Sequence, residues 1–503
     1  MRSRKALINT IFAIILEVVT MISSIIVPRI IIGKYGSDVN GLLTSITQFL
    51  GYLTLLESGV GGVVKASLYK PLAEHDRLQI SRVIRATEIF FRKIALASVI
   101  YIAILTVILP LFLKSNWEFA YTTSLVIIIG INNIAQYYFG MPSQLLIRAD
   151  QRGYIYSSIQ IVSTVLNVII VFITVNLGYS IQVVKLSSAV VFVARPILLN
   201  LYVTHKYEIE KNVPPDNKAL IQRWNGVGFS IASFVHKKTD VFLITLFLSL
   251  KEVSVYSVYS TIAVGLDAVV SMTTNSFQAA FGNMIAKDED HALMRSFRVY
   301  NLIVHMLSFV LFSVAIVMMI SYVKLYSKGI TDVNYLRPIF GIILILGEFV
   351  FCLRMPYQAV VTAAGHYKQT QAGAVLEAII NILLTIAFIF KWGIVGAAIG
   401  TLASMIYRTL DYVFYLSRNI IRLSPSYFFL RILIGLISSI IGIATCFILH
   451  LDRANSWLVW IGKSACSLVL MGMINVIFNY LFYKDDFMNC INSFGNAIYK
   501  KRT

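Results

Sequence analysis

The chain has 503 residues, of which 58% are hydrophobic and 13% are charged, and its mean hydropathy is +0.77. This composition excludes an ordinary soluble globular protein and predicts an all-α, polytopic membrane protein. The formal net charge is +19. In membrane proteins such an excess of Lys and Arg is typical of cytoplasmic loops, so it does not indicate nucleic-acid binding.

Apolar runs define the predicted elements, because a spanning helix needs about 20 apolar residues. The first run follows Met-Arg-Ser-Arg-Lys and is too long for a signal peptide, and no small-residue cleavage site ends it, so we expect a retained helix. By this measure the sequence predicts about fourteen spanning helices, at 7–32, 40–66, 91–113, 118–147, 154–176, 181–203, 224–250, 253–284, 297–322, 336–363, 368–390, 394–416, 428–450 and 457–483.

Lys and Arg are divided unevenly between alternate connecting segments. One set includes the basic segments 68–85 and 204–222 and both ends of the chain. Because basic loops stay in the cytoplasm, we expect this set and both termini to lie inside. The other set carries little more than Lys34, Lys114, Lys251, Lys324, Lys328, Lys391 and Arg453.

The four cysteines show no metal-ligand spacing. Cys352, Cys446 and Cys466 lie inside apolar runs, and Cys490 lies in the C-terminal tail. We therefore expect free thiols and no metal site or cofactor.

The two halves of the sequence repeat each other at a constant offset. Met141-Pro142-Ser143-Gln144 corresponds to Met355-Pro356-Tyr357-Gln358, and at the same offset Asn167 corresponds to Asn381. The repeat unit is six helices, an even number, so both copies begin on the same side and the repeat is parallel.

The repeat predicts two six-helix lobes followed by two extra helices. The tail beyond them is basic at its end, and its apolar spacing fits either an interfacial amphipathic helix or a frayed tail. The predicted domains are an N-lobe of helices 1–6 (1–205), a cytoplasmic linker (206–222), a C-lobe of helices 7–12 (223–420), helices 13–14 (421–484) and a cytoplasmic basic tail (485–503).

Several runs of the sequence form recognisable motifs, among them Val27-Pro28-Arg29-Ile30-Ile31-Ile32-Gly33, Ser67-Leu68-Tyr69-Lys70-Pro71-Leu72-Ala73 and Trp392-Gly393-Ile394-Val395-Gly396. These runs resemble Wzx-type polysaccharide flippases of the multidrug/oligosaccharidyl-lipid/polysaccharide (MOP) exporter superfamily, which also contains the MATE multidrug exporters and lipid II flippases. The resemblance covers nearly the whole chain, but each motif is degenerate. It identifies the superfamily more firmly than the substrate.

The resemblance implies a flippase of the bacterial plasma membrane and not an enzyme. Its substrate would be an undecaprenyl-diphosphate-linked repeat unit of a capsule, lipopolysaccharide or exopolysaccharide, moved from the inner to the outer leaflet by alternating access. The implied partners are membrane lipids and the polysaccharide polymerase machinery. The implied fold has a V-shaped cavity lined by helices 1, 2, 7 and 8.

The predicted helix 224–250 carries charges in its middle. Gly226, Ser230, Ser233, Lys237 and Asp240 share one helical stripe. A Lys or Asp at the centre of a membrane helix costs roughly 2.5–3.5 kcal/mol on insertion scales. Two interpretations remain open: Lys237 pairs with Asp240, or the stripe lines a water-filled pathway.

An anionic diphosphate needs cations in a wet cavity. Arg29 could instead be an interface residue that extends its charge to the membrane surface. The candidate substrate-binding cations are Arg29, Lys237, Lys238, Arg354 and Arg408.

Acidic residues inside helices are candidates for coupling to H⁺ or Na⁺. Structural pairing, for example of Glu348 with Arg354, is the alternative. Asp267 has no basic residue within one turn of its helix, which makes it the better coupling candidate. The full set is Glu57, Asp240, Asp267, Glu348 and Glu377.

Two other functions were compared with the flippase. A cation-coupled drug or small-molecule antiporter of the same superfamily would favour a negatively charged cavity, whereas Arg29, Lys237 and Lys238 are positive. A membrane glycosyltransferase or polymerase needs carboxylates in sizeable external loops, and the external loops here are short and poor in acids. We therefore expect no catalytic residues.

The predicted topology can be tested by labelling. Single cysteines at Asn212 and Asn334, in a background without the four natural cysteines, should differ in reaction with an impermeant maleimide on intact cells. Asn334 lies in the predicted external loop and should react, whereas Asn212 lies in the predicted cytoplasmic linker and should not. Equal labelling at both positions would overturn the fourteen-helix topology.

Overall fold

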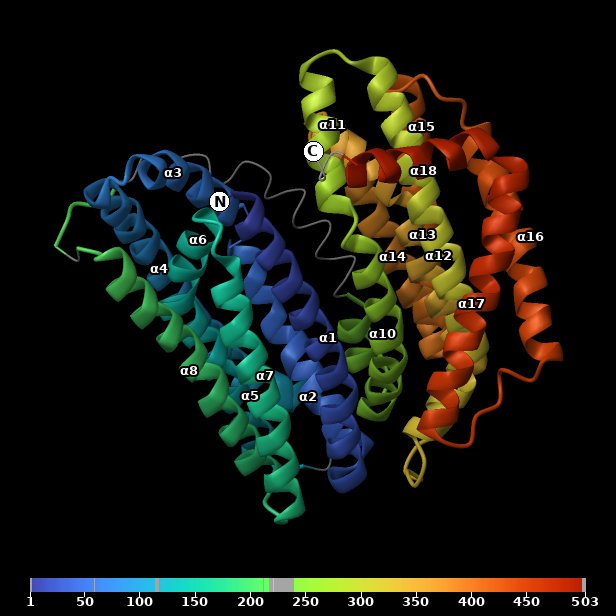
Figure 1. The fold of residues 1–503 in the computed structure, drawn as a ribbon. Helices are drawn as coiled ribbons and strands as arrows, with labels where there is room; N and C mark the ends of the chain where they lie inside the picture. The colour runs from blue at the N-terminus through green and yellow to red at the C-terminus, as the bar shows by residue number, and fades with distance from the viewer. Residues whose placement is uncertain are drawn as a thin grey trace. The chain divides into compact units, whose positions relative to one another are not determined.

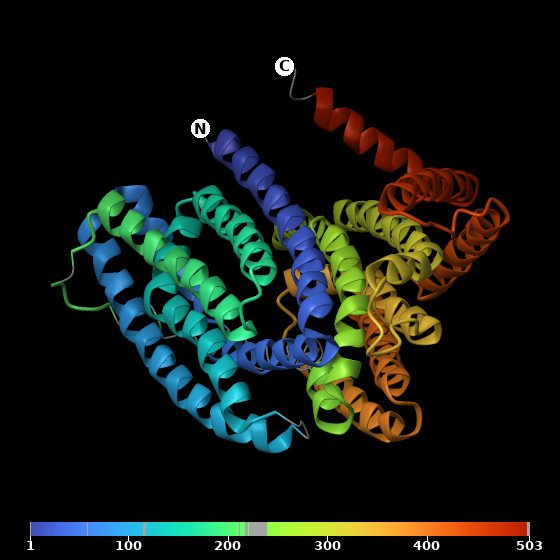
Figure 2. The ribbon, with the colours of Figure 1, turned by 90° about the horizontal axis from the view of Figure 1, so that it is seen from below.

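The computed structural model describes residues 2–57, 59–113, 117–210, 212–216, 220 and 239–499. Their regular secondary structure is helical throughout, and no strand occurs among them. The chain divides into two compact units, Met1–Ser257 and Val258–Thr503, each built from long helices (Figures 1 and 2). The prediction of an all-α protein is confirmed.

The first unit contains the helices of the predicted N-lobe. The segment Thr239–Phe247 is also helical and belongs to this unit. The elements are α1 (Arg2–Tyr35), α2 (Ser37–Gly51), η1 (Tyr52–Glu57), α3 (Val60–Glu74), α4 (Arg77–Phe112), α5 (Phe119–Ala135), η2 (Gln136–Gly140), α6 (Met141–Ala149), α7 (Gly153–Asn176) and α8 (Ile181–Tyr207).

The second unit begins inside α10 (Leu250–Ser271), which crosses the boundary between the units. The predicted linker 206–222 and the start of the predicted C-lobe fall partly outside the described residues, so the domain boundaries stay a prediction. The remaining elements are α11 (Thr274–Ala286), α12 (Asp290–Tyr326), α13 (Pro338–Ala363), α14 (Gln371–Trp392), α15 (Ile394–Asn419), α16 (Ser426–Ile448), α17 (Trp457–Phe482) and α18 (Lys484–Tyr499).

Twelve helices of the described chain are long and apolar enough to cross a membrane. They match twelve of the fourteen predicted spans. The predicted span 394–416 is present as α15, which carries Arg408 and Asp411 and is not among the twelve. The predicted span 224–250 is described only from Thr239 onward.

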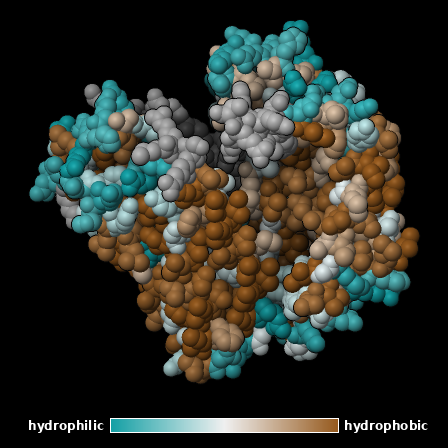
Figure 3. Space-filling view, in the orientation of Figure 1, coloured by the Kyte–Doolittle hydropathy of each residue, from teal (hydrophilic) through white to brown (hydrophobic). Residues whose placement is uncertain are grey.

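Apolar side chains along the helices remain exposed in each unit. Leu96, Ile100 and Ile104 on α4, for example, are all exposed although the helix is long and regular. On the face drawn in Figure 3, hydrophobic residues cover the middle of the helices and hydrophilic residues gather at their ends. Lipid tails are the solvent that such a surface requires, so the chain is a multi-pass membrane protein.

The internal repeat is visible in the element boundaries. Four boundaries of the first copy recur in the second at the offset that separates Met141 from Met355 in the sequence. The matched boundaries are the ends of η1 and α10 (Glu57 and Ser271), the starts of α3 and α11 (Val60 and Thr274), the ends of α4 and α12 (Phe112 and Tyr326) and the ends of α6 and α13 (Ala149 and Ala363).

Two predicted spans are interrupted at the same place in the repeat. The predicted helix 40–66 is α2, η1 and then α3, with a break before Val60. Gly59 has φ 91°, a left-handed conformation that glycine adopts without a Cβ penalty. The predicted helix 253–284 is likewise α10 and then α11, with a break at Met272 and Thr273. A hydropathy window of spanning length passes over these breaks, because it averages the few polar residues at each break with the apolar residues on either side.

The segment from Thr239 to Ser257 packs closely against α2. Asn40 Nδ2 donates to Ser254 Oγ at 2.9 Å, and these two residues are themselves separated by the repeat offset. Ser45 Oγ and Thr245 Oγ1 lie 2.7 Å apart. Between these bonds Gly41 lies directly against the backbone of Leu250, where a methyl group would overlap the carbonyl oxygen. Small residues of this kind let membrane helices approach closely.

The close approach at Gly41 predicts a sharp steric effect. Gly41→Ala should lower the stability of the solubilised protein by about 1–3 kcal/mol, as overpacking in a tight contact does. Gly51→Ala is the matched control, because Gly51 ends the same helix and an added methyl group meets nothing within 4 Å. Thermal unfolding followed by size-exclusion chromatography measures both. Equal stability of the two variants would contradict the packing described here.

Candidate functional site

A buried ionic network joins three helices of the second unit. Arg354 on α13 donates through Nη1 to Glu377 Oε1 on α14 at 2.7 Å. Arg408 Nε on α15 lies 3.5 Å from the other carboxylate oxygen of Glu377. Residue exposures are 6% for Arg354, 4% for Glu377 and 1% for Arg408, so water screens these charges very little. One carboxylate therefore bridges two guanidinium groups.

The network continues along α15. Arg408 Nη1 pairs with Asp411, and Arg408 Nη2 donates to the Tyr412 hydroxyl at 3.0 Å. The Arg408 guanidinium also lies over the Tyr412 ring at 4.1 Å. Gly373 on α14 leaves room for this pair, since a methyl group there would overlap both Arg408 Nη1 and Asp411 Oδ2. Two cations are thus matched by two carboxylates.

This arrangement bears on three predicted site residues. Arg354, Arg408 and Glu377 come together, and the geometry favours mutual pairing over binding of an external anion or ion. Glu377, not a residue of its own helix, is the partner found for Arg354. The pairing of Glu348 with Arg354 was the alternative expected from sequence. Spacing along the chain could not reveal the real partner, because it lies on the next helix.

Asp240 lies in the first unit, at the start of the described helical segment. It is 6% exposed, and the Tyr256 hydroxyl donates to its Oδ2 at 3.0 Å. Lys237 and Lys238 lie outside the described residues. Both interpretations of the helix 224–250, an ion pair with Asp240 or a hydrated stripe, therefore stay predictions.

The remaining predicted residues occupy separate helices. Asp267 on α10 is 8% exposed and accepts a hydrogen bond from Ser271 Oγ, one turn later, at 2.9 Å. Glu57 ends η1, and its Oε2 is buried without a hydrogen bond among the described residues. Arg29 follows Pro28 near the end of α1, with its guanidinium against Gly33. Their roles in transport stay predictions.

Sequence reasoning missed an acid that lines a cavity of the first unit. Glu17 on α1 and Arg148 on α6 both line a cavity of about 370 Å³ between α1 and α7. Arg148 lies over the Tyr156 ring at 5.2 Å. Glu17 lies inside the predicted span 7–32. An acid inside an apolar run is a signal from which the sequence alone could have identified it as a candidate.

A second buried ion pair fixes the C-terminal helix. Arg431 Nη2 on α16 donates to Asp486 Oδ2 on α18 at 2.7 Å, and the Tyr427 hydroxyl donates to the same oxygen at 2.9 Å. The Arg431 guanidinium also lies 4.4 Å from the Tyr483 ring centroid. Burial raises the pKa of the Tyr483 phenol, and Arg431 partly offsets this. The tail is therefore helical as far as Tyr499, and not frayed from its start.

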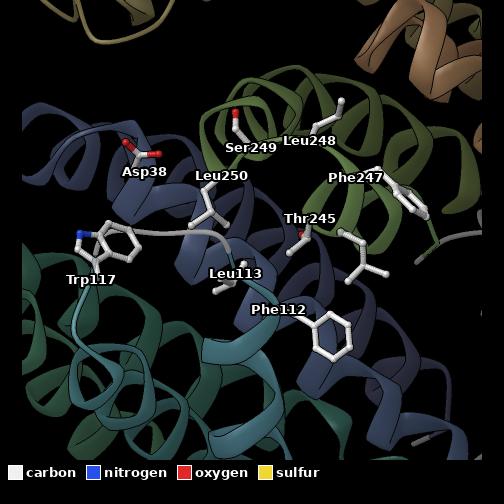
Figure 4. Close-up of a pocket in the computed structure, with 10 residues that line it drawn as sticks. Asp38, Phe112, Leu113, Trp117, Thr245, Phe247, Leu248, Ser249 and Leu250 are labelled. Carbon is white, nitrogen blue, oxygen red and sulfur yellow. The ribbon is translucent and has the colours of Figure 1, made fainter.

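A cavity of about 540 Å³ lies in the first unit (Figure 4). It is bounded by the ends of α2, α4 and α5 and by the turn between Phe247 and Leu250. Its wall mixes aromatic, apolar and polar groups. The lining residues are Asp38, Phe112, Leu113, Trp117, Thr245, Leu246, Phe247, Leu248, Ser249 and Leu250.

Solved structures with this fold are membrane transporters. The lipid II flippase MurJ in an inward closed conformation superposes with a TM-score of 0.71 and 15% identity, covering 95% of this chain and 99% of MurJ. An inward-facing multidrug MATE transporter of the MOP superfamily gives 0.58 and 12% identity, with 79% and 94% of the two chains covered. The MATE multidrug transporter DinF-BH gives 0.58 and 15% identity, with 82% and 94% covered.

These likenesses establish the fold, and identities of 12–15% establish nothing finer. No protein-family model matches the sequence, and no curated protein does. The chain therefore has the fold of these transporters, while the Wzx-type resemblance stays a prediction.

The bridging role of Glu377 can be tested directly. Glu377→Ala leaves two buried guanidinium groups uncompensated, which should destabilise the solubilised protein by about 3–5 kcal/mol. Asp411→Asn is the control, because the Asp411 side chain is 30% exposed and its loss should cost far less. Thermal unfolding measures stability, and transport with and without an ion gradient measures coupling. A Glu377→Ala protein of normal stability that has lost gradient dependence would instead establish Glu377 as a coupling residue.

Proposed function

We propose that this protein is a flippase that carries an undecaprenyl-diphosphate-linked polysaccharide repeat unit from the cytoplasmic to the outer leaflet. It works by alternating access in the plasma membrane of a bacterium, with both termini inside, and delivers its product to the polymerase machinery. Coupling to H⁺ or Na⁺ drives the cycle.

The extent of the likeness to MurJ is the observation that carries this proposal. The match covers 95% of the chain. The residues that lie outside the match are far fewer than the residues of the C-terminal segment 421–503. The match therefore includes most of that C-terminal part, which contains α16 and α17. The MATE matches leave about a fifth of the chain uncovered, at coverages of 79% and 82%. A C-terminal part shared with a lipid II flippase supports a lipid-linked substrate.

The distribution of charge supports an anionic head group. Arg354 and Arg408 are paired with Glu377 and Asp411. The cations proposed to bind the diphosphate are Arg29, Lys237 and Lys238. Opposite charges about 4 Å apart attract by roughly 4 kcal/mol at an effective dielectric constant near 20, against about 1 kcal/mol in bulk water. A partly dehydrated cavity would thus draw the diphosphate from the leaflet and release it when water enters.

Coupling is assigned to acids that lie inside helices, because acids in membrane spans are typical of proton and ion relays. Asp240 and Asp267 are buried in helices and accept hydrogen bonds from the hydroxyls of Tyr256 and Ser271. Glu57, whose Oε2 is buried at the end of η1, is the third proposed coupling residue.

A cation-coupled drug antiporter is the second candidate. The MATE likeness and the buried acids Asp240 and Asp267 favour it. The cavity of such an antiporter would have to attract cationic substrates, whereas the cavity of the flippase would have to attract an anionic diphosphate. Transport of a cationic dye by vesicles that contain the purified protein, together with normal surface polysaccharide in cells lacking it, would favour the antiporter.

Lys237 provides the decisive variant. Lys237→Ala should stop polysaccharide export while leaving protein abundance unchanged, because the diphosphate loses its cation. Lys237→Arg keeps the charge and should retain part of the export. Surface polysaccharide and protein level are measured in the same cells.

The pairing interpretation gives a different pattern. If Lys237 only neutralises Asp240, Lys237→Ala lowers abundance, and adding Asp240→Asn restores both abundance and export. Rescue by this double variant would remove Lys237 from the substrate site.

A further inference from the structure

The cavity of Figure 4 has a wall suited to a sugar ring. Trp117 precedes α5, and Asp38 lies in the first turn of α2 on the same side of the cavity. Phe112 and Leu113 close α4, and Leu250 opens α10. Aromatic and apolar side chains and a carboxylate therefore line one space of about 540 Å³, within the range of about 300–1,000 Å³ typical of small-molecule sites.

The polar part of the wall includes Asp38, whose ion-pair partner Lys251 follows the lining residue Leu250 but is not itself a lining residue. Asp38 Oδ2 lies 3.6 Å from Lys251 Nζ, and the two side chains are 44% and 38% exposed. Such an exposed pair is weak, so both groups can turn to a ligand at little cost. Ser249 adds a hydroxyl, and it lies in the short turn between Phe247 and Leu250. Helix ends of this kind leave backbone groups without intrahelical partners.

We propose that this cavity binds a sugar residue of the transported oligosaccharide, with the ring against Trp117 and its hydroxyls bonded to Asp38, Lys251 and Ser249. A pyranose presents a face of C–H groups, which an indole covers well, and a rim of hydroxyls that donate and accept at once. A carboxylate accepts hydrogen bonds and an ammonium group donates them, so neighbouring groups of these two kinds suit the hydroxyls at the edge of the ring. The assignment rests on the proposed function and extends it, since it names the part of the substrate that is recognised.

The predicted topology gives this cavity a place in the transport cycle. The segments that carry Lys34, Lys114 and Lys251 are predicted to lie outside. The sugar would then be held at the outer surface, whereas Lys237 and Lys238 fall in the middle of the predicted span 224–250. The contacts to the sugar and to the diphosphate would then lie at different depths in the membrane. Sugar binding at the outer surface would stabilise the state in which the substrate has reached the outer leaflet.

An interfacial role is the competing explanation for Trp117. Its ring centroid lies 5.2 Å from that of Tyr121, and both residues would sit in an aromatic belt at the outer membrane surface. A belt residue stabilises the protein in the bilayer and does not recognise sugars. The two roles therefore differ in what the loss of Trp117 changes.

The test uses the full chain in lipid nanodiscs. The probe is the oligosaccharide released by mild acid from the surface polysaccharide of the cells that make this protein, and its affinity is measured by saturation-transfer NMR titration. Trp117→Ala and Asp38→Asn should each weaken binding by about tenfold, whereas Trp117→Phe should keep most of it. Phe119→Ala is the matched control, since Phe119 is an exposed aromatic residue close by in the chain that does not line the cavity.

The outcomes separate the two proposals. If the unchanged protein binds the probe and both variants bind it equally well, the sugar lies elsewhere, and the site is refuted while the flippase stands. If the unchanged protein does not bind the probe, the site is also refuted, and export in cells lacking the protein decides the function. If Trp117→Ala lowers thermal stability in nanodiscs but leaves affinity unchanged, Trp117 is a belt residue.

Discussion

The hydrocarbon core of a membrane offers no hydrogen bonds, and this constraint governs the structure. Backbone groups are satisfied inside helices, so the described chain is helical, and polar side chains have to find partners on neighbouring helices. Asn40 and Ser254 meet this demand with one hydrogen bond, and Arg354 and Glu377 meet it with an ion pair. Both contacts join helices that the hydrophobic effect cannot hold together in lipid. Polar contacts therefore specify which helices pack together.

The same constraint makes buried charges pair with one another, so a charge with a structural role has to be distinguished from a charge that acts in transport. In the second unit Glu377 bridges Arg354 and Arg408, and Arg431 is paired with Asp486. Removing either partner of such a pair leaves a buried charge, which costs more than the pair itself contributes. A buried charge is thus a sign of function only after its neighbours on other helices are known.

The sequence predicted the helices well and their interruptions poorly. Hydropathy locates spans, and the constant offset between matching motifs predicts the repeat, because both signals are local or periodic. The break at Gly59 depends on one backbone conformation inside an apolar run, so hydropathy passes over it. Site residues were the least predictable, because partnership is a property of packing. Arg354 and Glu377 lie 23 residues apart on consecutive helices, and nothing in their spacing marks them as a pair.

The repeat shows where the two copies have diverged in chemistry. Arg195 lies as far from the start of α8 as Arg408 lies from the start of α15, yet it donates to the neutral Gln136 at 3.3 Å. At the offset that relates Met141 to Met355, the counterpart of Glu377 is Ser163, and Arg195 lies one residue after the counterpart of Arg408. The first copy therefore uses an amide where the second uses carboxylates. Duplication supplied one helical scaffold, and only the second copy placed a buried acid at this position.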